Sequence, residues 1–289
     1  MTPASPISLA IRSRASPGGP ALIPYITAGF PTKAAFIPQL RALAQHAAVI
    51  EVGVPFSDPM ADGVTIQRSS RVALEQGVSL DWILSELGKN RVSLRADVPL
   101  CLMSYLNPLL SIGLDQLGPR CAAAGISGLI IPDLPFEESA QLRREVGRHG
   151  VGLVQLVSPV TPHDRARAIA EASDGFLYAV TMTGVTGASA PSAHPLPEGG
   201  GRGVGSALSP LPLGGAGGGS ATSTESTNAY LARLRSVSPV PVCAGFGIRT
   251  REHVAALRTH ADGAIIGSAL IEAIERGEDA GEFVGGLAD

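Results

Sequence analysis

The 289-residue sequence predicts an α/β protein, a closed parallel (β/α)8 barrel of the TIM type with a short N-terminal helix. Two observations predict this class. Short apolar runs alternate with helical patterns eight times, and 45% apolar against 16% charged residues suits a large buried core. Alternation alone does not establish closure, so an open doubly wound sheet is the structural alternative. The first run lacks a following G-x-G-x-x-G segment, which gives no support to a dinucleotide fold.

The expected strands are short, rich in Val, Ile and Leu, and bounded by Gly, Pro or Asp. They cover residues 21–27, 47–50, 99–105, 126–132, 151–157, 176–181, 240–244 and 261–266. In a barrel the loops after these strands open on one face, so the residues that follow them share one rim.

The helices between these strands are predicted from caps and from apolar residues at helical spacing. Thr32 can cap a helix whose buried face includes Ala34, Ala35, Ile37, Leu40 and Leu43. Gly77 ends the helix at 65–76, and Ser79 can cap the next one, which contains Trp82. Further helices are expected at 113–124, from Phe136, after Thr161-Pro162, from Asn228, from Thr250 and from Ser268.

Residues 188–223 interrupt this alternation. The segment holds ten glycines and five prolines among 36 residues, and only Glu198 and Arg202 are charged. Such a composition buries too little apolar surface to offset its ordering entropy. We expect a flexible insertion in the sixth strand–helix loop of a single domain spanning 1–289, because neither flank could close a barrel alone.

Composition excludes several functional classes. A net charge of -3 and a pI near 6.1 give no electrostatic signature for nucleic acid or an anionic membrane. No run approaches the roughly 18 apolar residues of a membrane span, and the N-terminus lacks a convincing signal peptide. Cys101, Cys121 and Cys243 are too scattered for a disulfide framework, and the histidines show no metal-ligand spacing. We expect a cytoplasmic protein without a metal.

Two carboxyl groups are candidates for acid/base chemistry. Glu51 ends an apolar run, where poor solvation would raise its pKa and make it a proton donor near neutral pH. Asp62 lies on the following loop, where better solvation favours the ionised form. Two carboxyls with separated pKa values form an acid/base pair in outline. The structural alternatives are an ion pair at the rim for Glu51 and a turn or cap for Asp62.

Glycine-rich turns after the last two strands predict a phosphate site. Gly247 follows the seventh strand, and Gly267 with Ser268 follows the eighth and opens a helix. Glycines allow close backbone approach, and a helix N-terminus presents free N–H groups to an anion. The segment 183–187 can add a further N–H group; tight turns are the structural alternative. Tyr25, Tyr105 and Tyr178, near strand ends, predict an aromatic-walled pocket, with core packing as the alternative for each.

Seven segments in chain order carry a family resemblance. They read LIPYITAG, EVGVPFSDPMADGVTIQ, LMSYLNP, GLIIPDLP, TGVTG, GFGI and GSAL. In this order they resemble the tryptophan synthase alpha chain family over about residues 21–274, apart from the insertion. The resemblance implies retro-aldol cleavage of indole-3-glycerol phosphate to indole and glyceraldehyde 3-phosphate. It also implies an αββα assembly with a beta chain that holds pyridoxal phosphate, and no cofactor in this chain.

The resemblance also assigns roles to individual residues. Glu51 would move protons at indole C3 and at the glycerol hydroxyl, Asp62 would stabilise the indole N–H, and Tyr178 would lie beside the substrate. The implied phosphate ligands are Gly187, Gly247, Gly267 and Ser268, and the implied indole pocket is Tyr25, Met103, Tyr105 and Phe246.

Two departures from the family pattern and three alternatives remain. The family's usual SGVTG reads TGVTG here, and its usual proline after ADG is Val64. The insertion after Gly187 falls in the loop that closes over substrate in the family. The alternatives are a free-standing lyase that needs no beta chain, a non-catalytic subunit that activates a beta chain, and another phosphate-binding barrel such as a sugar-phosphate isomerase. The last leaves EVGVPFSDPMADG unexplained.

Overall fold

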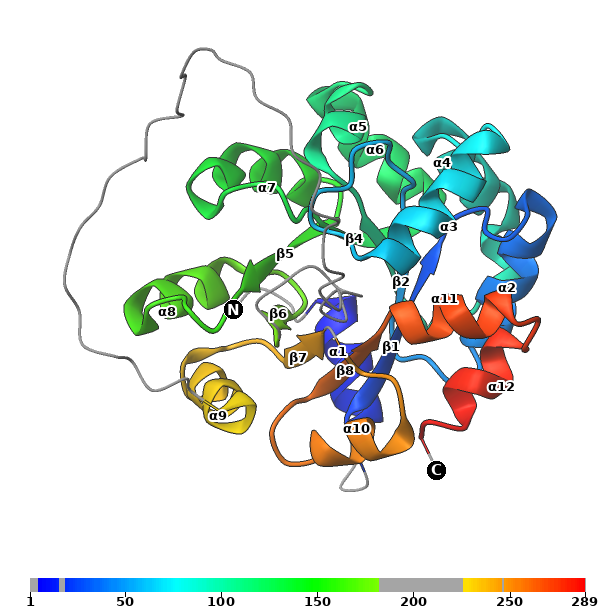
Figure 1. Ribbon diagram of the computed structural model, residues 1–289. Coiled ribbons are helices and arrows are strands. Elements are labelled where there is room, and N and C mark those ends of the chain that lie inside the picture. Colours follow the sequence, from blue (N-terminus) through cyan, green and yellow to red (C-terminus); the bar gives the residue numbers. More distant parts are fainter. Residues whose placement is uncertain (1–4, 16–18, 182–225, 246, 289) are drawn as a thin grey trace, which may run out of the picture.

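Eight parallel strands form a closed barrel in chain order, which confirms the expected closure and excludes the open sheet (Figure 1). This computed structural model describes residues 5–15, 19–181, 226–245 and 247–288. The strands are β1 Ala21–Thr27, β2 Ile50–Gly53, β3 Leu100–Met103, β4 Ile126–Ile130, β5 Gly152–Val157, β6 Leu177–Val180, β7 Val242–Gly245 and β8 Gly263–Ile266. The expected insertion at 188–223 lies outside the described residues.

Helices surround the barrel and cover its outer face (Figure 1). The α-helices are α1 Pro6–Arg14, α2 Phe36–Leu43, α3 Val64–Glu75, α4 Leu80–Asn90, α5 Leu106–Leu110, α6 Leu114–Ala124, α7 Ser139–Gly147, α8 His163–Ala172, α9 Thr227–Val237, α10 Arg251–Ala256, α11 Ser268–Glu275 and α12 Ala280–Gly285. Three single 3-10 turns are η1 Lys33–Ala35, η2 Arg91–Ser93 and η3 Phe136–Glu138.

The predicted caps form, and one of them corrects a prediction. The Ser79 hydroxyl accepts a hydrogen bond from the Trp82 N–H at 3.2 Å, and so begins α4. The Thr32 hydroxyl accepts from the Ala35 N–H at 3.3 Å, but it opens the 3-10 turn η1 and not an α-helix. The α-helix starts at Phe36, so Ala34 is exposed and the prediction that it belongs to the buried face was wrong.

The second strand begins later than predicted. β2 starts at Ile50, so Glu51 lies within the strand and does not follow it. Ala48 and Val49 precede β2, and both pack inside the barrel. Because a fully buried run has no alternation of apolar and polar residues, its sequence does not show where pairing starts.

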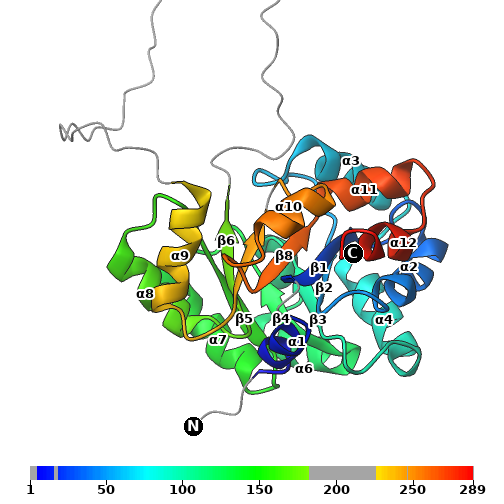
Figure 2. The same ribbon diagram turned by 90° about the horizontal axis from the view of Figure 1, so that it is seen from below.

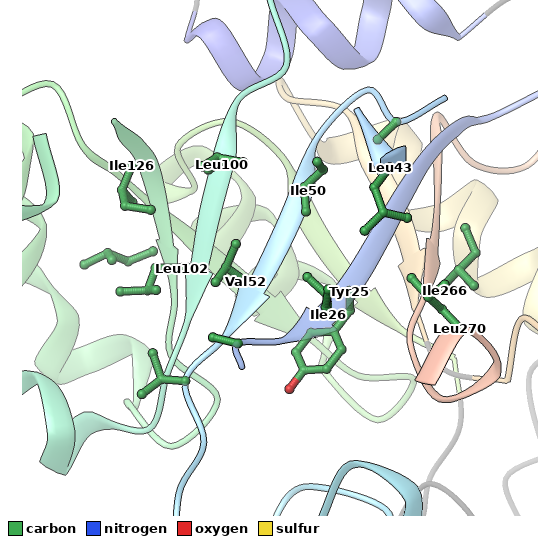
Figure 3. Close-up of a cluster of buried hydrophobic side chains, with 14 of the residues drawn as sticks. Tyr25, Ile26, Leu43, Ile50, Val52, Leu100, Leu102, Ile126, Ile266 and Leu270 are labelled. Carbon is green, nitrogen blue, oxygen red and sulfur yellow. The ribbon is translucent and has the colours of Figure 1, made fainter. Parts of the chain in front are cut away.

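Two apolar layers hold the barrel together. The outer layer joins the strands to the helices, and Figure 3 shows Ile50, Val52, Leu100 and Leu102 within it on neighbouring strands β2 and β3. The inner layer fills the barrel and includes residues of α1. At roughly 25 cal/mol per Å² of buried apolar surface, these two layers supply the main favourable term in folding.

Helix α1 closes one end of the barrel, at the lower edge of Figure 2. Its Ile7 is fully buried and belongs to the inner layer. The Ser8 hydroxyl donates to the carbonyl of Gly175, just before β6. The carboxyl ends of the strands lie at the opposite end, so the expected rim is the end that α1 leaves clear. No helix among the described ranges is long and apolar enough to cross a membrane.

Candidate active site

The Glu51 carboxyl group is buried inside the barrel without a hydrogen-bond partner. The residue is 0% exposed, and neither carboxyl oxygen bonds to a group in the described part of the chain. Strand register places it beside Tyr25 of β1 and Cys101 of β3. Desolvation by burial raises the pKa of Glu51 to about 8, so the carboxyl carries its proton at neutral pH. An ion pair at the rim, the structural alternative, is absent among these described neighbours.

Asp62 lies on the loop between β2 and α3, and it is half-buried. Desolvation raises its pKa to about 6, while a hydrogen bond with the Tyr105 hydroxyl lowers it. The same hydroxyl accepts a bond from the Ala61 N–H at 2.9 Å, so Tyr105 contacts both the loop backbone at Ala61 and the side chain of Asp62. At pH 7 the two carboxyls therefore differ, with Glu51 mostly protonated and Asp62 mostly ionised.

Two tyrosine rings fill the space over glycines at the ends of strands. A Cβ atom on Gly53 of β2 would lie 2.1 Å from the Tyr25 hydroxyl. A Cβ atom on Gly245 of β7 would lie 2.4 Å from the Tyr178 ring. Both tyrosines are buried, and desolvation raises the pKa of each well above its usual range, with smaller contributions from the charges of Glu51 and Asp62.

Register and pocket lining relate these side chains: Tyr25 pairs with Glu51 on the neighbouring strand, and it lines the same pocket as Asp62. Tyr25 and Tyr178 are each influenced by both carboxyls. Tyr178 also tilts against Phe176, with ring centroids 6.1 Å apart. Of the predicted catalytic residues, Glu51 and Tyr178 are buried in the barrel, and Asp62 lines the pocket that Tyr25 also lines.

A small pocket opens beside Asp62. It is lined by Tyr25, Val54, Asp62, Met103, Ser104, Tyr105 and Pro132. Three of the four residues predicted for an indole wall are therefore on it, and Phe56 stacks on Tyr105 with ring centroids 5.0 Å apart. Phe246, the fourth, lies outside the described residues. A second, larger cavity shares no residue with this pocket and is lined by Arg14, Gly19, Pro20, Ala21, Leu22, His46, Arg251, Val254, Ala255, Arg258, Leu287 and Ala288.

The predicted phosphate residues that the structure describes lie at the ends of β7 and β8. Gly267 immediately precedes α11, and Ser268 is its first residue. The first N–H groups of this helix have no acceptor within it, because intrahelical bonding starts at Leu270. Gly247 has φ of 83°, which favours glycine and lets the chain turn sharply after β7. Gly187 lies outside the described residues.

Several further polar or reactive side chains have structural roles. The Asp133 carboxylate accepts a bond from the Leu106 N–H at 2.9 Å and so caps α5. Cys101, Cys121 and Cys243 are all buried and unpaired with one another by disulfides. Within the described ranges no three His, Cys, Asp or Glu side chains gather as a metal site.

The sequence analysis missed several residues that shape the site. Gly53 and Gly245 leave room for the tyrosine rings, but a contact between residues distant in sequence has no local signal. The bond from Ala61 to Tyr105 joins positions 44 residues apart.

This fold and site define a (β/α)8 barrel with a protonated and an ionised carboxyl and a helix N-terminus suited to an anion. The family model described as tryptophan synthase alpha chain matches residues 12–199 and 211–284. The chain belongs to the tryptophan synthase alpha chain family.

Relatives match over nearly the full length. The chain is 38% identical over 277 residues to the tryptophan synthase alpha chain of Desulfovibrio desulfuricans, covering 95% of this chain and 96% of that one. It is 39% identical to that of Nitratidesulfovibrio vulgaris, covering 99% of both. Among solved structures, tryptophan synthase from Mycobacterium tuberculosis is similar with a TM-score of 0.77 and 31% identity, covering 99% of both chains. The tryptophan synthase complex of Pyrococcus furiosus has a TM-score of 0.73 and 29% identity, covering 93% of this chain and 97% of that one.

Proposed function

We propose that this chain, a tryptophan synthase alpha subunit and hence an indole-3-glycerol-phosphate lyase, performs its retro-aldol cleavage with Glu51, Asp62 and Tyr178. The observation that carries this assignment is the buried, unpartnered carboxyl of Glu51 beside a second carboxyl of lower pKa. A buried acid without a partner is expensive for folding, which supports a role in chemistry.

Glu51 serves as the proton donor and then as the base. Because its pKa is about 8, it enters the reaction protonated and can deliver that proton to indole C3. The resulting carboxylate then removes the proton of the glycerol hydroxyl next to the bond that breaks. The electrons of that C–C bond return to the ring, which gives indole and the aldehyde of glyceraldehyde 3-phosphate.

Asp62 acts at the indole nitrogen. Protonation at C3 places positive charge on the ring, and the ionised Asp62 stabilises the N–H that carries it. The charges of both carboxyls contribute to the raised pKa of Tyr178, after burial, and its ring is proposed to flank the substrate. Tyr25, Met103, Tyr105 and Phe246 are proposed as the wall that holds the indole ring, and the first three lie together at the pocket.

The substrate phosphate is proposed to bind at Gly187, Gly247, Gly267 and Ser268. The free N–H groups that begin α11 support this, together with the sharp turn at Gly247. Arg249 is close in sequence to Gly247, but Glu272 binds its guanidinium group. Backbone dipoles therefore supply most of the attraction in this proposal.

The similar structures include tryptophan synthase complexes, which implies a beta-chain partner. We propose the αββα assembly, with pyridoxal phosphate in the beta chain and no organic cofactor in this one. The barrel and the segment at 188–223 would form one domain.

Indole release from indole-3-glycerol phosphate tests the assignment in the wild type, Glu51→Gln and Asp62→Asn, each with and without beta chain. Each positioned acid/base group contributes about 10²–10⁴ in rate, so both variants should lose activity by at least that order. Asp58→Asn is the matched control, an exposed carboxyl in the same segment.

The same experiment separates the alternatives. Wild-type activity that the beta chain raises supports the tetramer, whereas high activity that ignores it would indicate a free-standing lyase. A wild type that is inactive under both conditions, yet still activates the beta chain, would indicate a non-catalytic subunit. Full activity in Glu51→Gln would refute the proposed proton donor.

A further inference from the structure

One side chain on α11 joins the two ends of the proposed site. Glu272 receives a hydrogen bond from the Thr65 hydroxyl at 3.2 Å, and it also binds both terminal nitrogens of Arg249. Thr65 is the second residue of α3, and Arg249 lies on the loop between β7 and α10. Three separate elements therefore meet at one carboxylate.

Each partner of Glu272 lies close to a proposed site residue. Thr65 follows Asp62 by three positions, in the first turn of α3, and is only 5% exposed. Arg249 follows Gly247 by two positions. Glu272 itself lies one helical turn after Ser268 in α11, so its carboxylate spans the Asp62 loop and the phosphate end.

The pKa of Glu272 reflects its bonds to Arg249 and Thr65. Burial alone would raise its pKa, but hydrogen bonds from Arg249 and Thr65, with the Arg249 charge, outweigh burial and lower the pKa. A bidentate Arg–carboxylate pair fixes direction as well as distance, which single-point ion pairs do not. The orientation of Arg249, and with it the loop after Gly247, is thus set by Glu272.

A second bridge between the same helices provides a natural control. One turn further along both helices, Arg68 of α3 binds Glu275 of α11 at 2.7 and 2.6 Å. Figure 1 and Figure 2 both show α3 and α11 side by side. This bridge joins the two helices, but no described bond connects it to the loop after β7. A variant of Arg68 therefore reports on helix packing alone, and a variant of Glu272 reports on the three-way junction.

We propose that Glu272 is a positioning residue that holds Asp62 and the phosphate-binding loop of β7 in a fixed relation. The inference rests on the proposed function, since it assigns a relation between two parts of that site. The contacts of Glu272 with Arg249 and with Thr65 connect the loop after Gly247 to the first turn of α3. Catalysis needs reacting groups held in a narrow geometry, and this link would hold Asp62 at a fixed distance from the phosphate-binding end.

Glu272→Gln is the central variant. Thr65→Val and Arg249→Gln each remove one of the two contacts of Glu272, called its arms here, and Arg68→Gln is the control. For each, kcat and KM for indole-3-glycerol phosphate, the pH profile of kcat/KM, the Kd of glycerol 3-phosphate and thermal stability are measured. Glu272→Gln is expected to lower kcat and weaken glycerol 3-phosphate binding, each about three- to tenfold. Thr65→Val should act mainly on kcat and the acidic limb, and Arg249→Gln mainly on Kd.

The double variant Thr65→Val/Arg249→Gln tests the link directly. If Glu272 couples the arms, the double variant is no worse than Glu272→Gln, so the single effects do not multiply. Arg68→Gln should keep kcat and Kd and change only stability. Equal effects in Arg68→Gln and Glu272→Gln, or independent effects of the two arms, would overturn the proposal.

Failure of the proposed function gives a different pattern. A wild type without turnover refutes the function, and the glycerol 3-phosphate Kd of Glu272→Gln against Arg68→Gln still decides whether the junction controls the anion end. Unchanged Kd in both variants would then overturn the inference as well.

Discussion

The Tyr25 hydroxyl lies where a side chain on Gly53 would have to be, 2.1 Å from the position of a Cβ atom on that glycine. The two residues come from adjacent strands, β1 and β2. Gly53 therefore carries no side chain for a reason that involves the active site, because the tyrosine ring it admits lines the pocket beside Asp62.

Gly53→Ala should destabilise the protein and impair catalysis. The added methyl group overlaps the Tyr25 ring, whose Cζ is also only 2.4 Å away, so the ring must move out of the pocket. Overpacking of this kind costs about 1–3 kcal/mol in unfolding free energy. Thermal unfolding and indole release measure both effects. Gly147→Ala in α7 is the control, since its Cβ meets nothing within 4 Å and should leave activity unchanged. If the clash is real, Gly53→Ala should lower the melting temperature less in a Tyr25→Ala background than in wild type, whereas a stable Gly53→Ala would contradict the clash.

The stability of the fold should decrease as pH rises through the range in which Glu51 titrates. Its folded pKa is about 8 against 4.5 when exposed, so between these values the folded state holds a proton that the unfolded state has lost. The contribution is fully present below about 4.5 and is lost by about 8, a few kcal/mol at about 1.4 kcal/mol per pKa unit.

The Glu51→Gln variant has no carboxyl at position 51 to titrate. Its melting temperature should therefore rise relative to that of wild type as the pH increases from about 5 to about 8. Differential scanning calorimetry at several pH values measures this. Asp58→Asn, with an exposed carboxyl, should follow the wild type. A constant difference between Glu51→Gln and wild type across this range would show that Glu51 is not held protonated.

The pH dependence of kcat/KM should be bell-shaped. Asp62 must be ionised, so the rate falls below its pKa of about 6, and Glu51 must be protonated, so the rate falls above about 8. Steady-state assays of the free enzyme across pH 5–9 give both limbs. A profile that is flat over this range would exclude the assigned protonation states.

Tyr105→Phe should move the acidic limb to higher pH. The Tyr105 hydroxyl forms a hydrogen bond with Asp62 that lowers the pKa of Asp62. Without this bond the effect of desolvation is larger, so the pKa of Asp62 rises. The Ala61 N–H also loses its acceptor, which loosens the loop. The assay is the same profile of kcat/KM, and Ser104→Ala, at a neighbouring residue of the pocket, is the control. An unmoved or lowered limb would refute the hydrogen bond.

Removal of residues 200–210 should preserve indole formation. The family model matches both flanks of this stretch but not the stretch itself, so the residues shared with the family remain. A variant that replaces 200–210 with a Gly/Ser sequence of equal length is the matched control. Comparison of kcat with and without beta chain detects any role, and loss of activation in the deletion alone would show that length matters.

The barrel itself was predictable because each of its eight strands is a compact apolar run. β1 has the predicted bounds, and Gly77 and Ser79 lie where the turn between α3 and α4 was expected. The short helix α5 was not predicted, since it contains Pro108 and follows β3 without a polar cap of its own. α12 was also missed, because two of its six residues are glycine, which favours a loop from propensity alone.

The two carboxyls of the site were predictable from sequence, but the residues that contact and position them were not. Burial near Glu51 follows from an apolar run, and a pKa of about 8 agrees with that expectation. The hydroxyl of Tyr105 on the Asp62 loop, and the Glu272 junction, depend on residues 44 and 207 positions apart. Such contacts exist only once the barrel has closed, so no local pattern in the sequence announces them.

Helix α1 is synthesised long before β6, the strand next to which it packs. Ser8 bonds to Gly175, 167 residues later, and Ile7 fills space left by Gly128 and Gly175. During translation the buried side chains of α1, Ile7 and Ile11, stay exposed until the sixth strand has been made, so α1 depends on the rest of the chain for protection from aggregation. A soluble partner fused before α1 should therefore increase the yield of folded protein.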